Sequence, residues 1–98
     1  MTTAEFKKSL NESRPPDGVT DLLRAIWYDC KGGWETSQNI AQDIESNEGS
    51  WVHAYLHRKE GDVGNAGYWY NRAGRKFPKY SLDEEWAEIV GMLLRGNS

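Results

Sequence analysis

Residues 50–78 read SWVHAYLHRKEGDVGNAGYWYNRAGRKFP, and this stretch predicts two consecutive helices joined by a tight turn. Ser50 and Asp62 are favourable N-caps, because their side-chain oxygens can accept hydrogen bonds from the free N–H groups of a first turn. Gly61 between them is the residue type that commonly ends a helix. Pro78 cannot continue a helix and closes the second one. The stretch therefore predicts a helical hairpin.

The rest of the chain shows the same helical spacing of apolar residues. The expected helices span Met1–Ser13, Val19–Lys31, Trp34–Ser46, Trp51–Glu60, Val63–Arg75 and Leu82–Arg95. No stretch sustains the alternation of apolar and polar residues that is typical of a strand. We therefore expect an all-α protein. Its core is expected to include Trp27, Ile40, Ala54, Ala66, Tyr70, Ala73, Trp86 and Leu93.

Composition narrows the class of protein. A chain of 98 residues is expected to form one domain, and its net charge of −3 gives no reason to expect nucleic-acid binding. Cys30 is the single cysteine, so an intrachain disulfide is excluded and a reducing compartment is favoured. There is no apolar run long enough to span a membrane and no signal-peptide segment. We expect a cytoplasmic protein that does not contact membranes.

Five residues carry a resemblance to a known family. Gly61, Ala66, Tyr70, Ala73 and Pro78 follow the pattern Gly-x4-Ala-x3-aromatic-x2-Ala-x4-Pro, which resembles the second half of a tetratricopeptide repeat. In that family, small residues let two antiparallel helices approach closely, an aromatic side chain fills the groove beside them, and the proline ends the second helix. The runs HAYLHRKEGD and YWYNRAG in the same hairpin are also similar to small uncharacterised bacterial proteins, which implies the fold only.

A weaker copy of the hairpin precedes this one. A shift of 29 residues places Ala25 on Ala54 and Gly32 on Gly61, although Ser37 stands where the repeat has an alanine. The resemblance thus implies antiparallel helical hairpins stacked as in tetratricopeptide repeats, with a C-terminal capping helix. The expected segments of this single domain are an N-terminal helix and Pro-rich turn (1–18), a degenerate hairpin (19–49), the tetratricopeptide-like hairpin (50–80) and the capping helix (81–98).

The most favoured function is a non-catalytic module that binds a protein or peptide. The first helices of the two hairpins and the basic, aromatic side of the fifth helix offer aromatic rings and cations that suit an acidic partner. The expected binding residues are Trp51, Tyr55, His57, Arg58, Trp69, Arg72 and Lys76, with Lys59 beside them. The competing interpretation is that the C-terminal helix covers Trp69 and that acids pair with Arg72. Self-association through exposed aromatic residues also remains open.

His53 and His57 support an alternative function. They lie four residues apart on one helix face and Glu60 follows three residues later, a spacing that suits a metal or a small molecule. Cys30, in the equivalent helix of the first hairpin, would be a further ligand or the nucleophile of a Cys–His pair. The simpler interpretation is that one histidine packs inside the repeat and the other is solvated or hydrogen-bonded. We therefore expect no enzyme activity, no cofactor and no metal.

Overall fold

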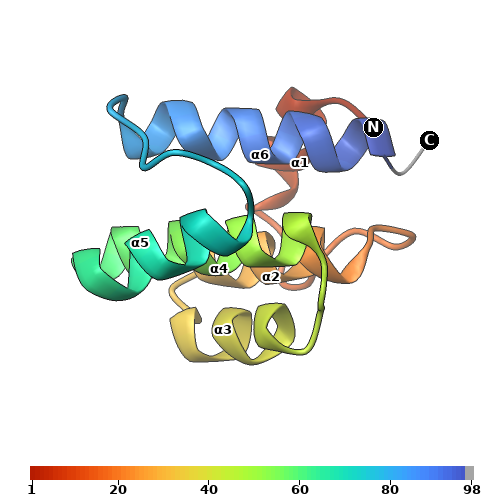
Figure 1. The fold of residues 1–98 in the computed structure, drawn as a ribbon. Helices are drawn as coiled ribbons and strands as arrows, with labels where there is room; N and C mark the ends of the chain where they lie inside the picture. The colour runs from red at the N-terminus through yellow and green to blue at the C-terminus, as the bar shows by residue number, and fades with distance from the viewer. Residues whose placement is uncertain (97–98) are drawn as a thin grey trace.

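The computed structural model describes residues 1–96, which form six helices and no strand (Figure 1). The all-α prediction is therefore confirmed for this part of the chain. Residues 97 and 98, which the expected capping segment includes, lie outside the described residues. The helices are α1 (Thr3–Ser9), α2 (Asp21–Cys30), α3 (Trp34–Gln42), α4 (Asn47–Glu60), α5 (Val63–Arg72) and α6 (Leu82–Gly96).

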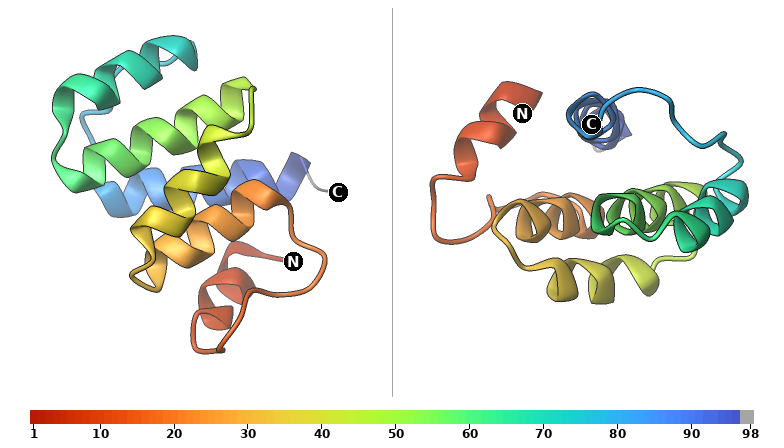
Figure 2. Two further views of the ribbon diagram at one scale, coloured as in Figure 1. Left: turned by 90° about the horizontal axis from the view of Figure 1, so that it is seen from below. Right: turned by 90° about the vertical axis from the view of Figure 1, so that its left-hand side faces the viewer.

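The helices form three layers (Figure 2). The middle layer contains α2, α4 and α5, with α3 on one side and α6 and α1 on the other. Consecutive helices pack in pairs, α2 with α3 and α4 with α5, and α3 also packs on α4. α6 lies over both α2 and α4, so the middle layer is covered from both sides. None of the helices in residues 1–96 has the length and apolar character needed to cross a bilayer.

The core lies on both sides of α4. Leu23, Ile26, Val52, Leu56 and Ile89 are fully buried, and burying such side chains is the main favourable contribution to folding. Most of the expected core residues are buried as well, namely Trp27, Ala54, Ala66, Tyr70, Ala73 and Leu93. Ile40 and Trp86 are only partly buried and pack against the edge of this core. The prediction that these two residues belong to the core is thus only partly right.

The junction between α3 and α4 differs from the expected one. Ser46, rather than Ser50, caps α4, and its Oγ accepts a hydrogen bond from the Gly49 N–H at 2.9 Å. Residues 47–49, expected as a loop, therefore form the first turn of the helix, and α3 ends at Gln42. The close approach of Gly49 to Ile44 allows this tight connection, because a Cβ at Gly49 would lie 2.2 Å from the Ile44 carbonyl oxygen.

α5 also ends earlier than expected. Its last residue is Arg72, and Gly74 follows with a positive φ of 73°. The Arg75 N–H donates to the Tyr70 carbonyl at 2.9 Å and the Gly74 N–H to the Asn71 carbonyl at 3.0 Å, a glycine-dependent stop known as the Schellman motif. The glycine, not Pro78, thus ends α5. α1 and α2 are also shorter than expected at both ends, whereas α6 is one residue longer.

Candidate functional site

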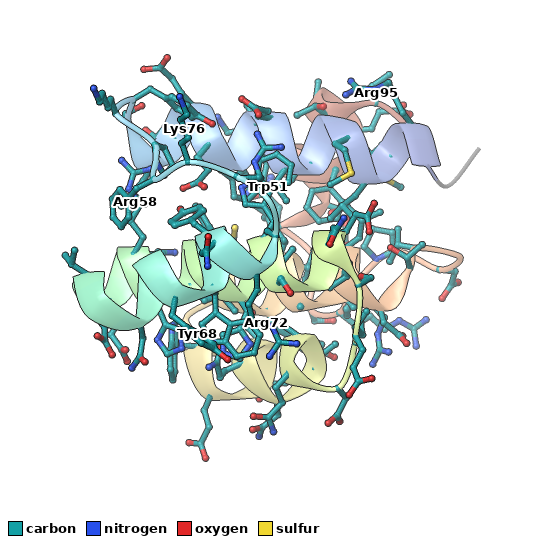
Figure 3. All side chains as sticks on the ribbon, in the orientation of Figure 1. Trp51, Arg58, Tyr68, Arg72, Lys76 and Arg95 are labelled. Carbon is teal, nitrogen blue, oxygen red and sulfur yellow. The ribbon has the colours of Figure 1, made fainter. Side chains whose placement is uncertain are left out.

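Three side chains of α5 form a group at the protein surface that we name the aromatic shelf: Tyr68, Trp69 and Arg72. The Arg72 guanidinium carbon lies 5.0 Å from the Trp69 ring centroid and 5.9 Å from the Tyr68 ring centroid. Arg72 Nη1 also donates to the Tyr68 hydroxyl at 3.4 Å. Helical spacing produces this contact, since residues three and four apart lie on the same helix face. Figure 3 shows Tyr68 and Arg72 together beside α3.

Trp69 holds the shelf against the neighbouring helices. Its ring stacks on His53 of α4, with centroids 3.9 Å apart and an interplanar angle of 16°. Such contact between parallel rings adds to the energy of apolar burial and fixes the ring orientation. Trp69 is half-buried in this stack, while Tyr68 is 54% exposed. Trp69 thus packs on the side of the middle layer that faces α3, and the competing expectation that α6 covers it does not hold.

A hollow of about 270 Å³ adjoins the shelf. Trp69 and Arg72 form one wall, and the end of α3 and the start of α4 form the others. The remaining lining residues are Ala41, Gln42, Ile44, Glu45, Ser46, Asn47, Gly49 and Ser50. Among residues 1–96, no carboxylate lies within ion-pair distance of Arg72. The hollow is therefore lined mostly by polar residues, Glu45 among them. Its guanidinium is stacked in place and forms no ion pair with the described carboxylates.

The structure does not bring all the expected binding residues together. Trp51 and Tyr55 are each 3% exposed and His57 is 9% exposed, so they belong to the core of this fold and not to its surface. Lys76 is exposed but lies in the loop after α5, and Figure 3 places it near α6, away from Arg72. The two basic residues do not share a helix face, because α5 ends before Lys76.

Glu85 organises a buried network that was not predicted from the sequence. Its carboxylate is fully buried and accepts hydrogen bonds from Trp51 Nε1 at 3.0 Å and from Arg58 Nη1 at 2.9 Å. The Tyr70 hydroxyl donates to it as well, and burial together with this carboxylate raises the Tyr70 pKa far above its usual value. A signal was present, since Glu85 lies one helical turn before Ile89 on the apolar side of α6. Arg58 is therefore used within the fold.

The two histidines meet at one glutamine. The Gln38 amide nitrogen lies 2.7 Å from His53 Nε2 and 3.2 Å from His57 Nε2. The amide can donate to both rings when each of them carries its proton on Nδ1. Both Nδ1 atoms and Gln38 Oε1 are buried without a hydrogen-bond partner among the described residues. Burial, followed by the neighbouring His57, lowers the pKa of His53 to about 4, so this ring is neutral at pH 7.

Cys30 lies apart from the histidines. The Trp86 indole Nε1 donates to its Sγ at 3.1 Å, in a groove of about 510 Å³ that Tyr55 and Lys59 also line. Positions 55 and 59 project from the side of α4 opposite to positions 53 and 57, since successive helical residues turn by about 100°. A metal site or nucleophile pair that joins Cys30 to a histidine therefore does not form.

Two other basic residues, Lys59 at this groove and Arg75, are engaged within the fold. Lys59 Nζ lies 2.8 Å from Oδ2 of the buried Asp29. The Arg75 guanidinium carbon lies 3.5 Å from the Trp51 ring centroid, and Arg75 also forms an ion pair with Glu88. The aromatic shelf thus combines an accessible guanidinium, aromatic faces and an adjoining hollow. Comparison of the chain with protein-family models, with curated proteins and with solved structures found no match.

Proposed function

We propose that this protein is a non-catalytic interaction module that binds a carboxylate-bearing peptide or protein segment at the aromatic shelf. The main support for the proposal is the position of Arg72, whose guanidinium stacks on the rings of Trp69 and Tyr68. A guanidinium can stack on aromatic faces and still present its N–H groups in the plane to a carboxylate. Because stacking already orders the side chain, binding an acid loses less conformational entropy.

The packing of the helices supports a tetratricopeptide-like arrangement as the framework of this module. Ala54 and Ala66, the small residues of the repeat pattern, are fully buried where α4 and α5 pack together. Tyr70, the aromatic of the pattern, is 1% exposed. α3 packs on α4 much as one hairpin packs on the next in a helical repeat. We propose that α2–α3 and α4–α5 are two such stacked hairpins.

The position of α6 explains why the proposed site uses α5. A capping helix is expected at the end of the stack, but α6 lies over α2 and α4, the first helices of the two hairpins. It thereby covers most of the face on which Trp51, Tyr55 and Arg58 were expected to bind a partner. Lys59, at the edge of this face, stays exposed and pairs with Asp29. Glu85 of α6 supplies a carboxylate to Arg58 on that face. The free acid-binding group lies on the other side, at Arg72.

The size of the hollow favours a segment of a macromolecule. At about 270 Å³, the hollow is at or below the lower limit of pockets that enclose a drug-sized ligand, which measure roughly 300–1,000 Å³. It accommodates one side chain or a chain end, held by Arg72 and packed against Ile44 and Trp69. The flanking residues of the partner would extend over exposed α5, where Tyr68 adds an aromatic contact.

A peptide selection tests this function. Random peptides displayed on phage are selected on the full chain, and the affinity of synthetic copies is measured by fluorescence anisotropy. We expect the selected peptides to contain Asp, Glu or a free C-terminus. Arg72→Glu should weaken them by at least tenfold, because it replaces a charge-assisted donor by a repulsive charge. Arg72→Lys should give an intermediate loss, because lysine keeps the charge but loses the planar stack.

Lys76→Glu is the matched control, since it reverses a charge in the loop after α5, near α6 and away from Arg72, and should change the affinity by less than about twofold. Equal binding by wild type and Arg72→Glu would disprove the proposed site, as would a selection that yields only peptides without acidic groups. Sedimentation velocity on the free chain distinguishes binding of a separate partner from self-association. A dimer that is lost in Tyr68→Ser would make a second copy the partner.

A further inference from the structure

The turn between α4 and α5 holds three potential metal ligands together. Gly61 adopts a positive φ of 91°, and the Asp62 N–H donates to the His57 carbonyl at 2.9 Å. This Schellman-type stop folds the chain back, so that Asp62 returns to the end of α4 beside His57 and Glu60. His57 Nδ1 lies 3.6 Å from Glu60 Oε1 and 3.8 Å from Asp62 Oδ2.

The histidine nitrogen that faces these carboxylates is buried and has no hydrogen-bond partner within residues 1–96. Buried polar atoms are nearly always hydrogen-bonded, so an unpaired nitrogen directed toward two carboxylates calls for an explanation. The side chains of Glu60 and Asp62 are 42% and 39% exposed, so an ion can reach the group from solvent. The three ligand atoms all lie within 4.8 Å of one another.

Asp62 is already held in position as the N-cap of α5. Its Oδ1 accepts from the Asn65 N–H at 3.3 Å, and its Oδ2 accepts from Asn65 Nδ2 at 2.7 Å. These hydrogen bonds stabilise the carboxylate and lower the pKa of Asp62. An oxygen that accepts one hydrogen bond keeps a lone pair for a cation.

We propose that His57 Nδ1, Glu60 and Asp62 bind a divalent transition-metal ion, with Zn²⁺ as the best match. One imidazole nitrogen and two carboxylate oxygens suit this ion, whose bonds to such ligands are about 2.0–2.2 Å long. Tetrahedral ligands at those distances lie about 3.4 Å apart. The two nitrogen–oxygen distances in the structure exceed this by only a few tenths of an ångström, and water would complete the coordination.

Gln38 provides the outer support that such a site needs. Metal binding at Nδ1 requires that the proton of neutral His57 move to Nε2, which must then find an acceptor. Gln38 Nε2 lies 3.2 Å from that atom, and Gln38 Oε1 is buried with no hydrogen-bond partner in the described part of the chain. A half-turn of the terminal amide exchanges donor for acceptor, so Oε1 accepts from His57 Nε2–H. Oε1 then also faces Nε2 of His53, and the proton of that ring moves to Nε2 so that it can donate to Oε1. Each proton moves within its own ring, so neither ring changes its charge.

Calorimetric titration of the full chain with Zn²⁺ tests the site. We expect binding near one ion per chain. Glu60→Gln and Asp62→Asn should each weaken the affinity at least tenfold, and the asparagine of the second variant retains the ability to cap α5. Gln38→Met should weaken it by about 10–100-fold, the usual cost of losing a partner of a metal-bound histidine. Glu48→Gln, at the other end of α4, is the matched control and should leave the affinity unchanged.

Long-range ¹H–¹⁵N NMR spectra of the histidine rings provide a readout that a purely structural role would not change. His57 should carry its proton on Nδ1 in the free chain and on Nε2 after Zn²⁺ is added. The site is disproved if millimolar Zn²⁺ produces no binding heat, if neither Glu60→Gln nor Asp62→Asn weakens binding, or if Nε2 becomes the metal-bound atom. Arg72→Glu should leave Zn²⁺ binding intact, so this test is independent of the one for the aromatic shelf.

Discussion

The Tyr70 hydroxyl lies 2.8 and 2.6 Å from the two oxygens of the Glu85 carboxylate, and both residues are almost completely excluded from solvent. Tyr70 belongs to α5 and Glu85 to α6, so this contact joins the second hairpin to the C-terminal helix. Arg58 and Trp51 of α4 complete the donor set. A buried carboxylate is tolerated only when hydrogen bonds and a counter-charge replace its water. The network therefore connects α6 to both α4 and α5.

Replacing this carboxylate should destabilise the protein strongly. Glu85→Gln leaves the Arg58 charge, whose side chain is 17% exposed, without its partner, and we expect a loss of about 3–5 kcal/mol in the free energy of unfolding. Urea unfolding followed by circular dichroism measures it. Glu88→Gln is the control, because it breaks the solvent-exposed pair with Arg75 and should cost less than about 1 kcal/mol. Similar losses in the two variants would contradict this account of the network.

Stability should depend on the protonation of His53. Its pKa is about 4 in the folded chain, compared with an ordinary value of 6.5. The contribution of the neutral ring to the free energy of unfolding is therefore complete above pH 6.5. It is lost as the pH falls toward 4, because His53 binds a proton at a higher pH in the unfolded chain than in the folded one. The difference of 2.5 pH units corresponds to about 3 kcal/mol.

Comparing the urea midpoints at about pH 7 and about pH 4.5 tests this dependence. His53→Phe keeps a flat ring against Trp69 but cannot bind the proton, so its midpoint should fall less than that of the wild type. Other groups titrate equally in both proteins. The test therefore compares how far the urea midpoint falls between the two pH values in the wild type and in His53→Phe. Parallel pH profiles would show that His53 is not responsible.

The tight junction before α4 should tolerate no added side chain. A Cβ at Gly49 would lie 2.2 Å from the Ile44 carbonyl oxygen, and this backbone atom cannot move away alone. We expect Gly49→Ala to lower the free energy of unfolding by about 1–3 kcal/mol. Gly67→Ala is the control, because nothing lies within 4 Å of the added atom and alanine should stabilise α5 by about 0.5–1 kcal/mol. Thermal unfolding of both variants checks this, since Gly49→Ala should lower the melting temperature and Gly67→Ala should raise it.

Cys30 should react slowly with thiol reagents. Burial raises the pKa of its thiol above the ordinary value, so the reactive thiolate is scarcer than in a free cysteine. We expect bromobimane to label Cys30 more slowly than glutathione at about pH 8. Labelling in urea provides the control, since unfolding should restore the ordinary rate. Faster labelling of the native chain than of glutathione would indicate an activated cysteine and reopen a catalytic role.

The sequence by itself determined the helical class and most of the local structure. Gly61 and Asp62 end one helix and start the next because left-handed backbone geometry and N-capping depend on residues close together in the chain. Ala66 and Tyr70 were expected in the core from helical spacing and from the repeat pattern, and Ala54 from the repeat pattern, and all three are buried. The choice of Ser46 over Ser50 as the N-cap was not predictable in this way, because both are good caps and the contact of Gly49 with Ile44 decides between them.

Tertiary structure decided the location of the sites. Trp51, Tyr55 and Arg58 have residue types suited to a binding surface, yet α6 covers them, and its Glu85 supplies a carboxylate to Arg58. Local sequence could not reveal this pairing, since Arg58 and Glu85 lie 27 positions apart and belong to separate helices. The same holds for Gln38 between the two histidines and for Trp69 stacked on His53. Local spacing specifies which face of a helix is apolar, whereas long-range packing decides which polar groups on that face find partners and which stay free to bind something else.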